Sequence, residues 1–396
     1  SIRRQRQMCI RDRPYMDHAE TDLNPRYERG TLQEVYEMIG KDIEAGIPLI
    51  DDTAYSVPKY HFNYKAACCF ASRYYLFMQD WDNAIKYATM ALTSNPSSLL
   101  RDYSAIAALP NGTSRHQEYV NSASTANFLL QAATSNSGLL FDWYSTAGRY
   151  SHGKLQGIYE TVQPKKGGPW GSSVTFKAPH AVLASSGKYV LPRTWRVFQY
   201  TDPVAGTGFN KAISVLFTSE EALLNRAEAY IMKMNEDPTA LDKALEDINL
   251  YAANLFSAGF KSMTEASIIK WATETYPDYS ELYVGKTSVS SPQTLNPKKK
   301  LHAAPYNTLE EGGPQESMLQ ALIFMRRYQF LHEGMRWFDT RRFGITVYRY
   351  LLDEDAETVV QITDQISDEN GTADPRRALQ LPADVIAAGL TPNPRK

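Results

Sequence analysis

YKAACCFASRYYLFMQDWDNAIKYATMALTSNP, residues 64–96, is the stretch that decides the fold class of this chain. Small residues recur along it at helical spacing, where two neighbouring helices must approach each other closely. They are Ala67, Ala71, Ala84, Ala88 and Ala91. The bulky side chains of Tyr75 and Trp81 stand beside Gln79-Asp80. The stretch therefore predicts a hairpin of two helices with its turn at Gln79-Asp80.

The spacing within this hairpin resembles that of a tetratricopeptide repeat at four positions, Tyr75, Ala84, Ala91 and Pro96. Trp81 would fill the large-aromatic position of the second helix, whereas Gln79 replaces the usual turn glycine. A fold built from such hairpins is mostly α.

Further helical stretches lie on both sides of it. Helical spacing starts at Thr31, where Thr31-Leu-Gln-Glu34 has the form of a capping box. Residues 214–256 form a looser second copy, with Ser219 as its expected N-cap, and residues 317–344 give a third long stretch. We therefore expect helical hairpins near 31–96, 214–256 and 317–344.

The intervening residues have a different character. Residues 97–210 are rich in Ser, Gly, Pro and aromatic residues and show no sustained period, which predicts long irregular loops and little β structure. Loops of this length in a compact protein usually carry function or are disordered. The many aromatic residues of 141–200, including three tryptophans, disfavour disorder there.

Composition excludes several classes of protein. The net charge of −2 gives no reason to expect a nucleic-acid partner. The chain has three cysteines and no CxxC pair, so neither a zinc site nor a disulfide framework is indicated, and we expect no cofactor. No apolar stretch approaches the roughly 20 residues of a membrane span.

The basic stretch SIRRQRQMCIRDR, residues 1–13, resembles translated sequencing-adapter sequence and lacks the apolar core of a signal peptide. We expect residues 1–13 to be a non-native or disordered arm and residues 14–396 to form a single domain.

The stretch YQFLHEGMRWFDTRRFG, residues 328–344, concentrates charge. Glu333 and Asp339 could be the paired carboxylates of a glycoside hydrolase. On a helix, however, a separation of six residues turns them to different sides, and Arg336 lies three residues from both. The block is therefore interpreted as a structural scaffold in which Arg336 pairs with both carboxylates, and Gly334 admits a neighbouring backbone. No catalytic residues are assigned.

Several segments in order resemble the SusD/RagB family of outer-membrane nutrient-binding lipoproteins, over roughly residues 25–394. They are RGTLQEVYEMIGKDIEAGIPLI, the alanine-rich hairpin, LLNRAEAYI, the charged block and the ending LQLPADVIAAGLTPNP. The positions that match the family's charged block are Arg327, Glu333, Gly334, Arg336, Asp339, Arg341, Arg342 and Gly344.

The resemblance implies a SusD-like fold in a chain that is the C-terminal portion of a longer protein. It implies a non-catalytic protein in the outer leaflet of the outer membrane, held by an N-terminal lipid that this chain lacks. Such a protein captures oligosaccharides and delivers them to a SusC-like TonB-dependent transporter. The resemblance leaves open which glycan is bound and whether calcium takes part.

Aromatic rings on loops can stack on the apolar faces of sugars while polar groups bond to the hydroxyls, and residues 141–200 supply both. The candidate ligand residues are Trp143, Tyr144, Trp170, Trp195, Asp142, Arg149 and Arg193. Trp170 is the leading candidate, because its flanking glycines are expected to leave the ring uncovered.

Two other functions remain open. A tetratricopeptide-type adaptor would bind peptides or proteins in a concave helical groove, and the long aromatic loops disfavour it. A glycoside hydrolase is disfavoured by the lack of a paired-carboxylate constellation.

Overall fold

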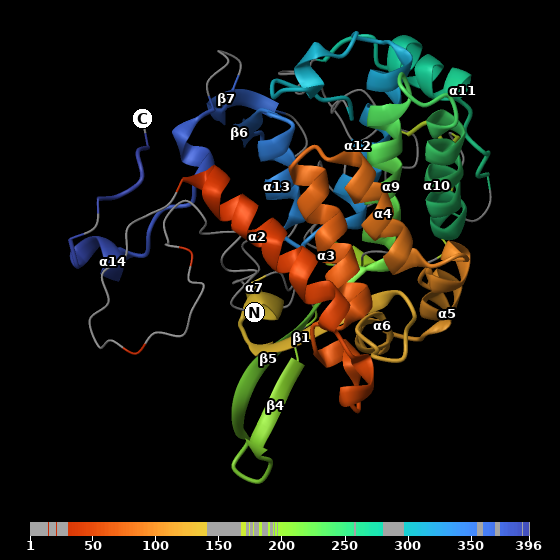
Figure 1. The fold of residues 1–396 in the computed structure, drawn as a ribbon. Helices are drawn as coiled ribbons and strands as arrows, with labels where there is room; N and C mark the ends of the chain where they lie inside the picture. Colours follow the sequence, from red (N-terminus) through yellow and green to blue (C-terminus); the bar gives the residue numbers. More distant parts are fainter. Residues whose placement is uncertain are drawn as a thin grey trace. The chain divides into compact units, whose positions relative to one another are not determined.

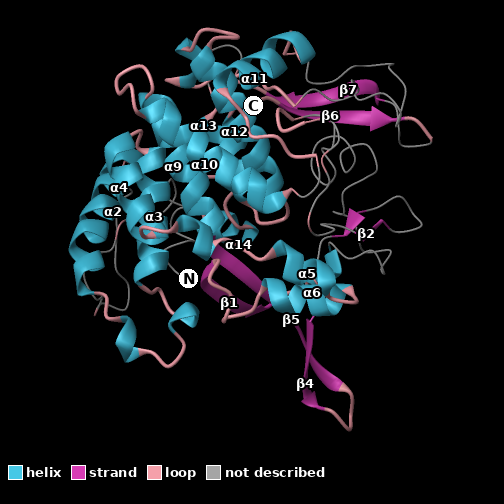
Figure 2. Cartoon of the chain, turned by 90° about the vertical axis from the view of Figure 1, so that its right-hand side faces the viewer, coloured by secondary structure: helices cyan, strands magenta, loops and turns pink. Residues whose placement is uncertain are grey.

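The computed structural model describes most of the chain outside residues 141–167 and 280–296. The described residues are 15, 21, 31–140, 168–171, 174, 177, 182–183, 189–190, 193, 195, 197–256, 259–279, 297–354, 359–368, 373–389 and 391–395. Helices dominate these residues (Figure 2), so the predicted mostly α fold is confirmed. The structure divides into two compact units, one of residues 1–50 and 366–396 and the other of residues 51–365.

The smaller unit contains α2 (Leu32–Gly46) and α14 (Ala383–Ala387). Helix α2 begins at the predicted capping box: the Thr31 hydroxyl accepts a hydrogen bond from the Glu34 backbone N–H, and the Glu34 carboxylate accepts one from the Thr31 N–H. Two of the free N–H groups at the helix start are thereby satisfied.

The larger unit is built around two helical hairpins. The first joins α3 (Tyr64–Phe77) to α4 (Trp81–Leu92), and the second joins α9 (Ser219–Lys233) to α10 (Ala240–Leu255). Helix α4 packs against α3 on one side and α9 on the other, which Figure 1 shows in orange and green. The contact faces are lined by fully buried small residues, which include Ala71, Ala84, Ala88, Ala91, Ala222 and Ala229. Small side chains let the helix axes approach, as the sequence pattern predicted.

A third pair follows in the charged block. Helix α12 (Pro314–Gln329) packs on α9, and α13 (Met335–Arg342) follows after a sharp break. The break contains two residues with left-handed backbone, His332 at φ 62° and Gly334 at φ 79°. A β-carbon on Gly334 would meet nothing within 4 Å, so this glycine serves the backbone conformation and does not admit a neighbouring backbone as predicted.

The strands were not predicted. Strands β1 (Asn127–Thr134), β5 (Thr207–Thr218) and β4 (Val197–Asp202) form an antiparallel sheet in the order β1-β5-β4. Strands β6 (Val347–Leu352) and β7 (Val359–Ile366) form a separate pair. Because β5 runs to Thr218, the N-cap of α9 is Thr218 and not Ser219 as predicted. The other α-helices and strands in the described part of the chain are α5 (Tyr103–Ala108), α6 (Gly112–Tyr119), α7 (Ser137–Leu140), α11 (Glu265–Lys270), β2 (Val182–Leu183) and β3 (Tyr189–Val190).

Candidate functional site

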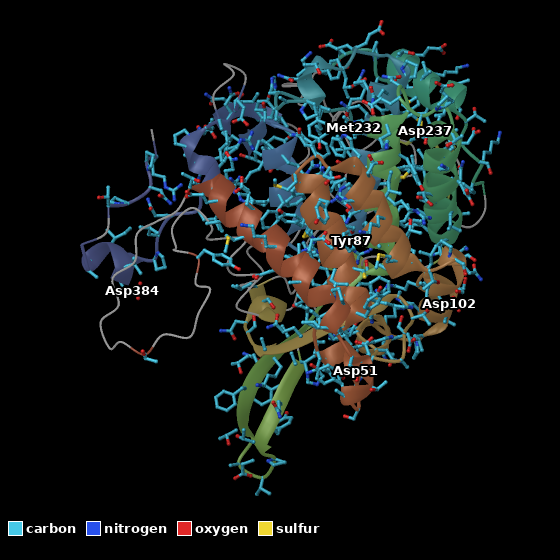
Figure 3. The ribbon with its side chains drawn as sticks, in the orientation of Figure 1. Asp51, Tyr87, Asp102, Met232, Asp237 and Asp384 are labelled. Atoms are coloured by element: carbon cyan, nitrogen blue, oxygen red, sulfur yellow. The ribbon has the colours of Figure 1, made fainter. Side chains whose placement is uncertain are left out.

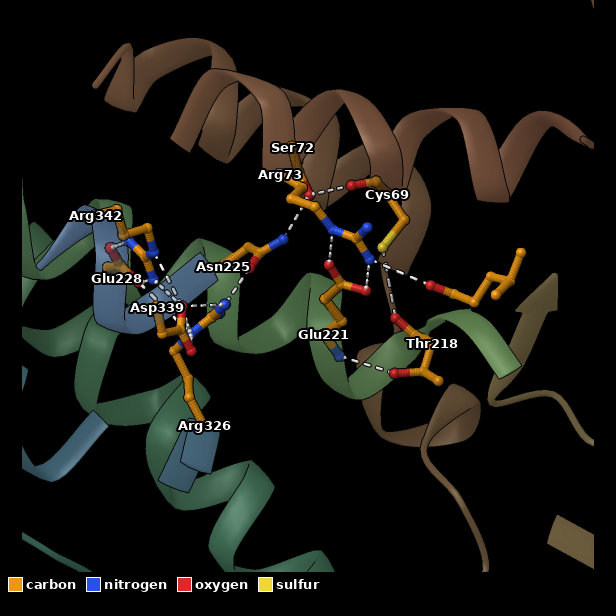
Figure 4. Close-up of polar contacts among 11 residues, drawn as sticks. Cys69, Ser72, Arg73, Thr218, Glu221, Asn225, Glu228, Arg326, Asp339 and Arg342 are labelled. Carbon is orange, nitrogen blue, oxygen red and sulfur yellow. Dashed lines mark hydrogen bonds and ion pairs between the residues drawn. The ribbon is translucent and has the colours of Figure 1, made fainter. Parts of the chain in front are cut away.

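One buried polar face of α9 organises the charged residues of the larger unit (Figure 4). Glu221, in the first turn of the helix, receives the guanidinium of Arg73 from α3, with Nε 2.5 Å from Oε1 and Nη2 2.6 Å from Oε2. The same guanidinium donates to the Leu216 carbonyl, 3.2 Å away, and its carbon lies 4.5 Å from the centre of the Phe217 ring. This pair joins the two hairpins and the base of β5.

Further along α9, Asn225 and Glu228 meet the charged block. Arg326 of α12 donates to Asn225 through Nη1 at 2.8 Å and to Asp339 of α13 through Nε at 3.2 Å. Arg342 donates to both Glu228 oxygens and to Asp339. Burial would raise the pKa of Asp339, but Arg326 and Arg342 lower it below its ordinary value. The predicted scaffold of ion pairs is therefore present, and its role is to tie α9 to α12 and α13.

Glu333 has partners that the sequence did not predict. It lies in the break before α13 and accepts a hydrogen bond from the Tyr119 hydroxyl, and its Oε1 is 3.8 Å from Nη1 of Arg193. Burial raises the pKa of Glu333 above its ordinary value. Asp339 is held by Arg326 and Arg342, and the charge of Arg336 also helps to lower its pKa, whereas Glu333 is held by Tyr119 and Arg193. Sequence spacing missed these partners because they come from other segments.

Arg193 was predicted to bond to ligand hydroxyls. Its side chain is instead buried, donates to the Gln329 carbonyl and lies 5.3 Å from the centre of the Tyr119 ring. These contacts anchor residue 193 to the end of α12 and to α6.

The position of Trp170 contradicts the argument that made it the leading ligand candidate. The side chain is only 1% exposed, and its ring packs between Phe256 at 5.0 Å and Phe324 at 5.2 Å, measured between ring centres. A β-carbon on Gly168 would lie 2.1 Å from the indole. The prediction that flanking glycine leaves the ring uncovered is therefore wrong, because Gly168 makes room for the ring to enter the core.

Trp195 is placed differently. Its side chain is partly exposed, and its indole Nε1 donates to the Thr113 hydroxyl at 3.1 Å. The ring lies against Gly112, the first residue of α6, where a β-carbon would approach it to 2.4 Å. Trp195 is thus a surface indole in a fixed orientation, a geometry that suits a planar ligand contact.

The other four candidates, Asp142, Trp143, Tyr144 and Arg149, lie outside the described residues. Exposed rings that were not predicted occur instead at Tyr55, Tyr60, His61 and Phe62. The sequence signal was available: four rings within eight residues, without helical spacing, just before α3.

Over the described ranges, no three His, Cys, Asp or Glu side chains are grouped so that they could hold a metal ion. Every helix in the same ranges is too short or too polar to cross a lipid bilayer.

Comparison with sequence families gives one match. Residues 7–76 match a SusD-like family described as "Starch-binding associating with outer membrane". The match begins within residues 1–13, the segment predicted to be a non-native arm, and ends in α3. No protein with a curated description matches the chain.

Solved structures give broader likenesses. A SusD superfamily protein from Bacteroides vulgatus is 16% identical over 92% of this chain and 66% of its own, with a TM-score of 0.48. A SusD superfamily protein from Bacteroides thetaiotaomicron is 14% identical over 93% and 67%, with a TM-score of 0.48. A SusD-like carbohydrate binding protein from Bacteroides vulgatus is 16% identical over 90% and 65%, with a TM-score of 0.45. The chain thus spans about two thirds of the length of these structures.

Proposed function

We propose that this chain is a member of the SusD/RagB family and a non-catalytic glycan-binding protein of the bacterial cell surface. The observation that carries the proposal is the match of residues 7–76 to a family described as starch-binding and associated with the outer membrane. The protein would be anchored in the outer leaflet of the outer membrane by an N-terminal lipid.

The ligand site is proposed around Trp195. A sugar ring has a face of C–H groups that carry partial positive charge, and an indole face carries the complementary negative charge of its quadrupole. The hydrogen bond to Thr113 fixes the Trp195 ring before the ligand arrives, so little rotamer freedom is lost on binding. Trp143, Tyr144, Asp142 and Arg149 are proposed to complete this site, whereas Trp170 and Arg193 support it from the interior.

The charged block supports a binding role over hydrolysis. A retaining or inverting glycosidase needs one carboxyl group that can give up a proton and a second one facing the same bond. Asp339 is engaged by two arginines, and Glu333 by Tyr119 and Arg193. Arginine neighbours keep the Asp339 carboxylate ionised, which suits an ion-pair partner and not a general acid.

The captured oligosaccharide is proposed to pass to a SusC-like TonB-dependent transporter, over which this protein would act as a lid. Co-purification with a SusC-like transporter of the source organism tests this step directly. Failure of the two proteins to associate in detergent would contradict the delivery role and leave glycan binding to be judged on its own.

Calorimetric titration with maltooligosaccharides, followed by a wider glycan array, tests the ligand class. We expect Trp195→Ala to weaken the affinity by about tenfold, which corresponds to about 1.4 kcal/mol. Tyr200→Ala is the matched control, because it removes an exposed ring from strand β4 that is not among the proposed ligand residues.

Three results would overturn the proposal. They are binding to a peptide panel in place of glycans, release of shortened products after long incubation with polysaccharide, and equal losses of affinity in the two variants.

A further inference from the structure

The segment between α2 and α3 exposes aromatic side chains that the fold does not use as core. We define the aromatic loop as residues 51–62. Within it Tyr60 is 54% exposed, Phe62 41% and Tyr55 39%, and His61 is also exposed. Single exposed apolar residues are normal on a protein surface, whereas rings gathered in one short segment indicate a contact surface.

Hydrogen bonds fix the backbone of the aromatic loop at both ends. Asn63 is buried and donates through Nδ2 to the carbonyls of Pro58, His61 and Phe128, the last of these on strand β1 at 2.6 Å. Asp52 accepts from the Tyr64 N–H at 2.9 Å, at the start of α3. The loop is thus held to α3 and to the sheet before any ligand binds.

Lys59 adds a third attachment in the middle of the loop. Its ammonium donates to the Ser124 carbonyl, just before β1. Lys59 keeps its positive charge, but this contact turns the half-buried ammonium toward the Ser124 carbonyl, so that Lys59 helps to hold the loop.

Contacts with other rings hold two of the exposed rings, Tyr55 and Phe62, in fixed positions. Tyr55 and His61 stack face to face, with ring centres 4.0 Å apart and planes within 10°. One face of each ring is therefore used by the other, and the partial exposure of Tyr55 leaves ring surface open to solvent. Phe62 is held edge-on by Phe70 and Phe217, at 6.0 and 6.2 Å, so its exposed part is also fixed in place.

The charges at the edge of the aromatic loop favour one kind of ligand. Asp51 is exposed and lies at the start of the 3-10 turn Asp52–Ala54, which leads directly to Tyr55 (Figure 3 labels Asp51). Hydrogen bonds from Thr53 lower the pKa of Asp51, so this carboxylate stays ionised at neutral pH. A carboxylate accepts hydrogen bonds from hydroxyl groups and repels acidic groups. The edge therefore complements a neutral, hydroxyl-rich ligand and opposes an anionic one.

We propose that the aromatic loop is a second carbohydrate-binding surface, separate from Trp195, which takes a neutral oligosaccharide on the rings of Tyr55, His61 and Tyr60. The carboxylate of Asp51 receives hydroxyl hydrogen bonds from it. This inference rests on the proposed function, since it gives the same protein a second contact with the same class of ligand. Two surfaces on one chain would increase its retention on a polymer by raising the effective concentration of the second contact.

The test compares binding to insoluble starch and to maltoheptaose in the wild type, Tyr55→Ala/Tyr60→Ala, Trp195→Ala and the control Tyr200→Ala. We expect the double variant to lose about tenfold in affinity for starch while keeping the binding of maltoheptaose at the Trp195 site. The variant Tyr55→Phe/Tyr60→Phe, which keeps both rings, should bind as the wild type does. Oligogalacturonate, an acidic oligosaccharide, should not compete at the loop, and should begin to compete in Asp51→Asn.

The outcomes separate the two proposals. A wild type that binds no glycan overturns the proposed function and this inference together. A wild type that binds starch with the double variant unchanged overturns only the inference, and so does equal competition by oligogalacturonate. The wild type could also bind peptides, and the double variant could lose that binding while its starch binding stays unchanged. The aromatic loop would then be a protein contact, and the inference of a second carbohydrate surface would be overturned. Circular dichroism spectra of each variant check that the helices remain folded.

Discussion

Arg73 of α3 and Glu221 of α9 form a bidentate ion pair that both hairpins bury. The two side chains are almost inaccessible to solvent, and both guanidinium–carboxylate contacts are within 2.6 Å. A buried carboxylate that loses its charge leaves the opposite charge without compensation. The pair therefore fixes how the first hairpin lies on the second.

Glu221→Gln should lower the free energy of unfolding by about 3–5 kcal/mol, because Arg73 would remain buried without its counter-charge. Urea denaturation followed by circular dichroism measures this change. Glu274→Gln is the matched control: Glu274 pairs with Lys270 at 3.7 Å, but both side chains are exposed, so the loss should stay within about 0.5 kcal/mol. Similar losses in the two variants would contradict the argument.

Sequence periodicity predicted the helices well because their contacts are local. Ala84, Ala88 and Ala91 repeat on one face of α4, and all three are fully buried. Strand β5 gave no such signal, since its partner β1 lies far away in the chain and both strands are partly exposed. A strand whose stability comes from a distant partner leaves little trace in a local pattern.

The candidate site was predicted less well, for a related reason. Composition identified the aromatic residues. It could not show whether a neighbouring glycine leaves a ring open to solvent or makes room for the ring in the core. Gly168 admits Trp170 to the core, and Gly112 lies against the ring of Trp195. The same limit applies to Glu333, whose partners Tyr119 and Arg193 are 214 and 140 residues away in the chain.

The charge of Asp339 should make the free energy of unfolding depend on pH in the acid range. Its pKa is lowered in the folded state, so it contributes stability above its ordinary value of 3.8, and this contribution is lost as the pH falls through the lowered value. Asp339→Asn should be destabilised at neutral pH and should lose less further stability than the wild type between pH 4 and 2. Unfolding free energies measured across this range check the slope, and parallel curves for the two proteins would contradict the assignment.

Glu333 should affect the pH dependence of stability in the opposite direction from Asp339. Its pKa is raised by burial, so its contribution is present below the ordinary value of 4.5 and is lost as the pH rises through the raised value. Glu333→Gln keeps an acceptor for the Tyr119 hydroxyl without the buried charge. The variant should therefore lose less stability than the wild type as the pH rises above 4.5, which the same denaturation series measures. A steeper loss in the variant would show that the pairing with Arg193 outweighs burial.

Gly168→Ala should destabilise the protein by about 1–3 kcal/mol, because the new methyl group would lie 2.1 Å from the buried indole of Trp170. Gly46→Ala is the control with the opposite expectation. Its β-carbon would meet nothing within 4 Å at the end of α2, and alanine should stabilise by about 0.5–1 kcal/mol. Thermal unfolding of the two variants checks both signs. An undisturbed melting temperature in Gly168→Ala would mean that the indole is not packed on this glycine.

Cys68 and Cys69 should be unreactive while the protein is folded. Both thiols are fully buried in α3, and burial raises the pKa of Cys68 to about 11 and that of Cys69 well above its ordinary value. The thiolate is the reacting form, so a thiol reagent at pH 8 finds little of it and cannot reach it without unfolding. In a Cys9→Ser background, we expect labelling of both residues only through the denaturant transition, in parallel with the loss of helix signal. Rapid labelling of either cysteine in native buffer would contradict the packing of α3 against α4 and α9.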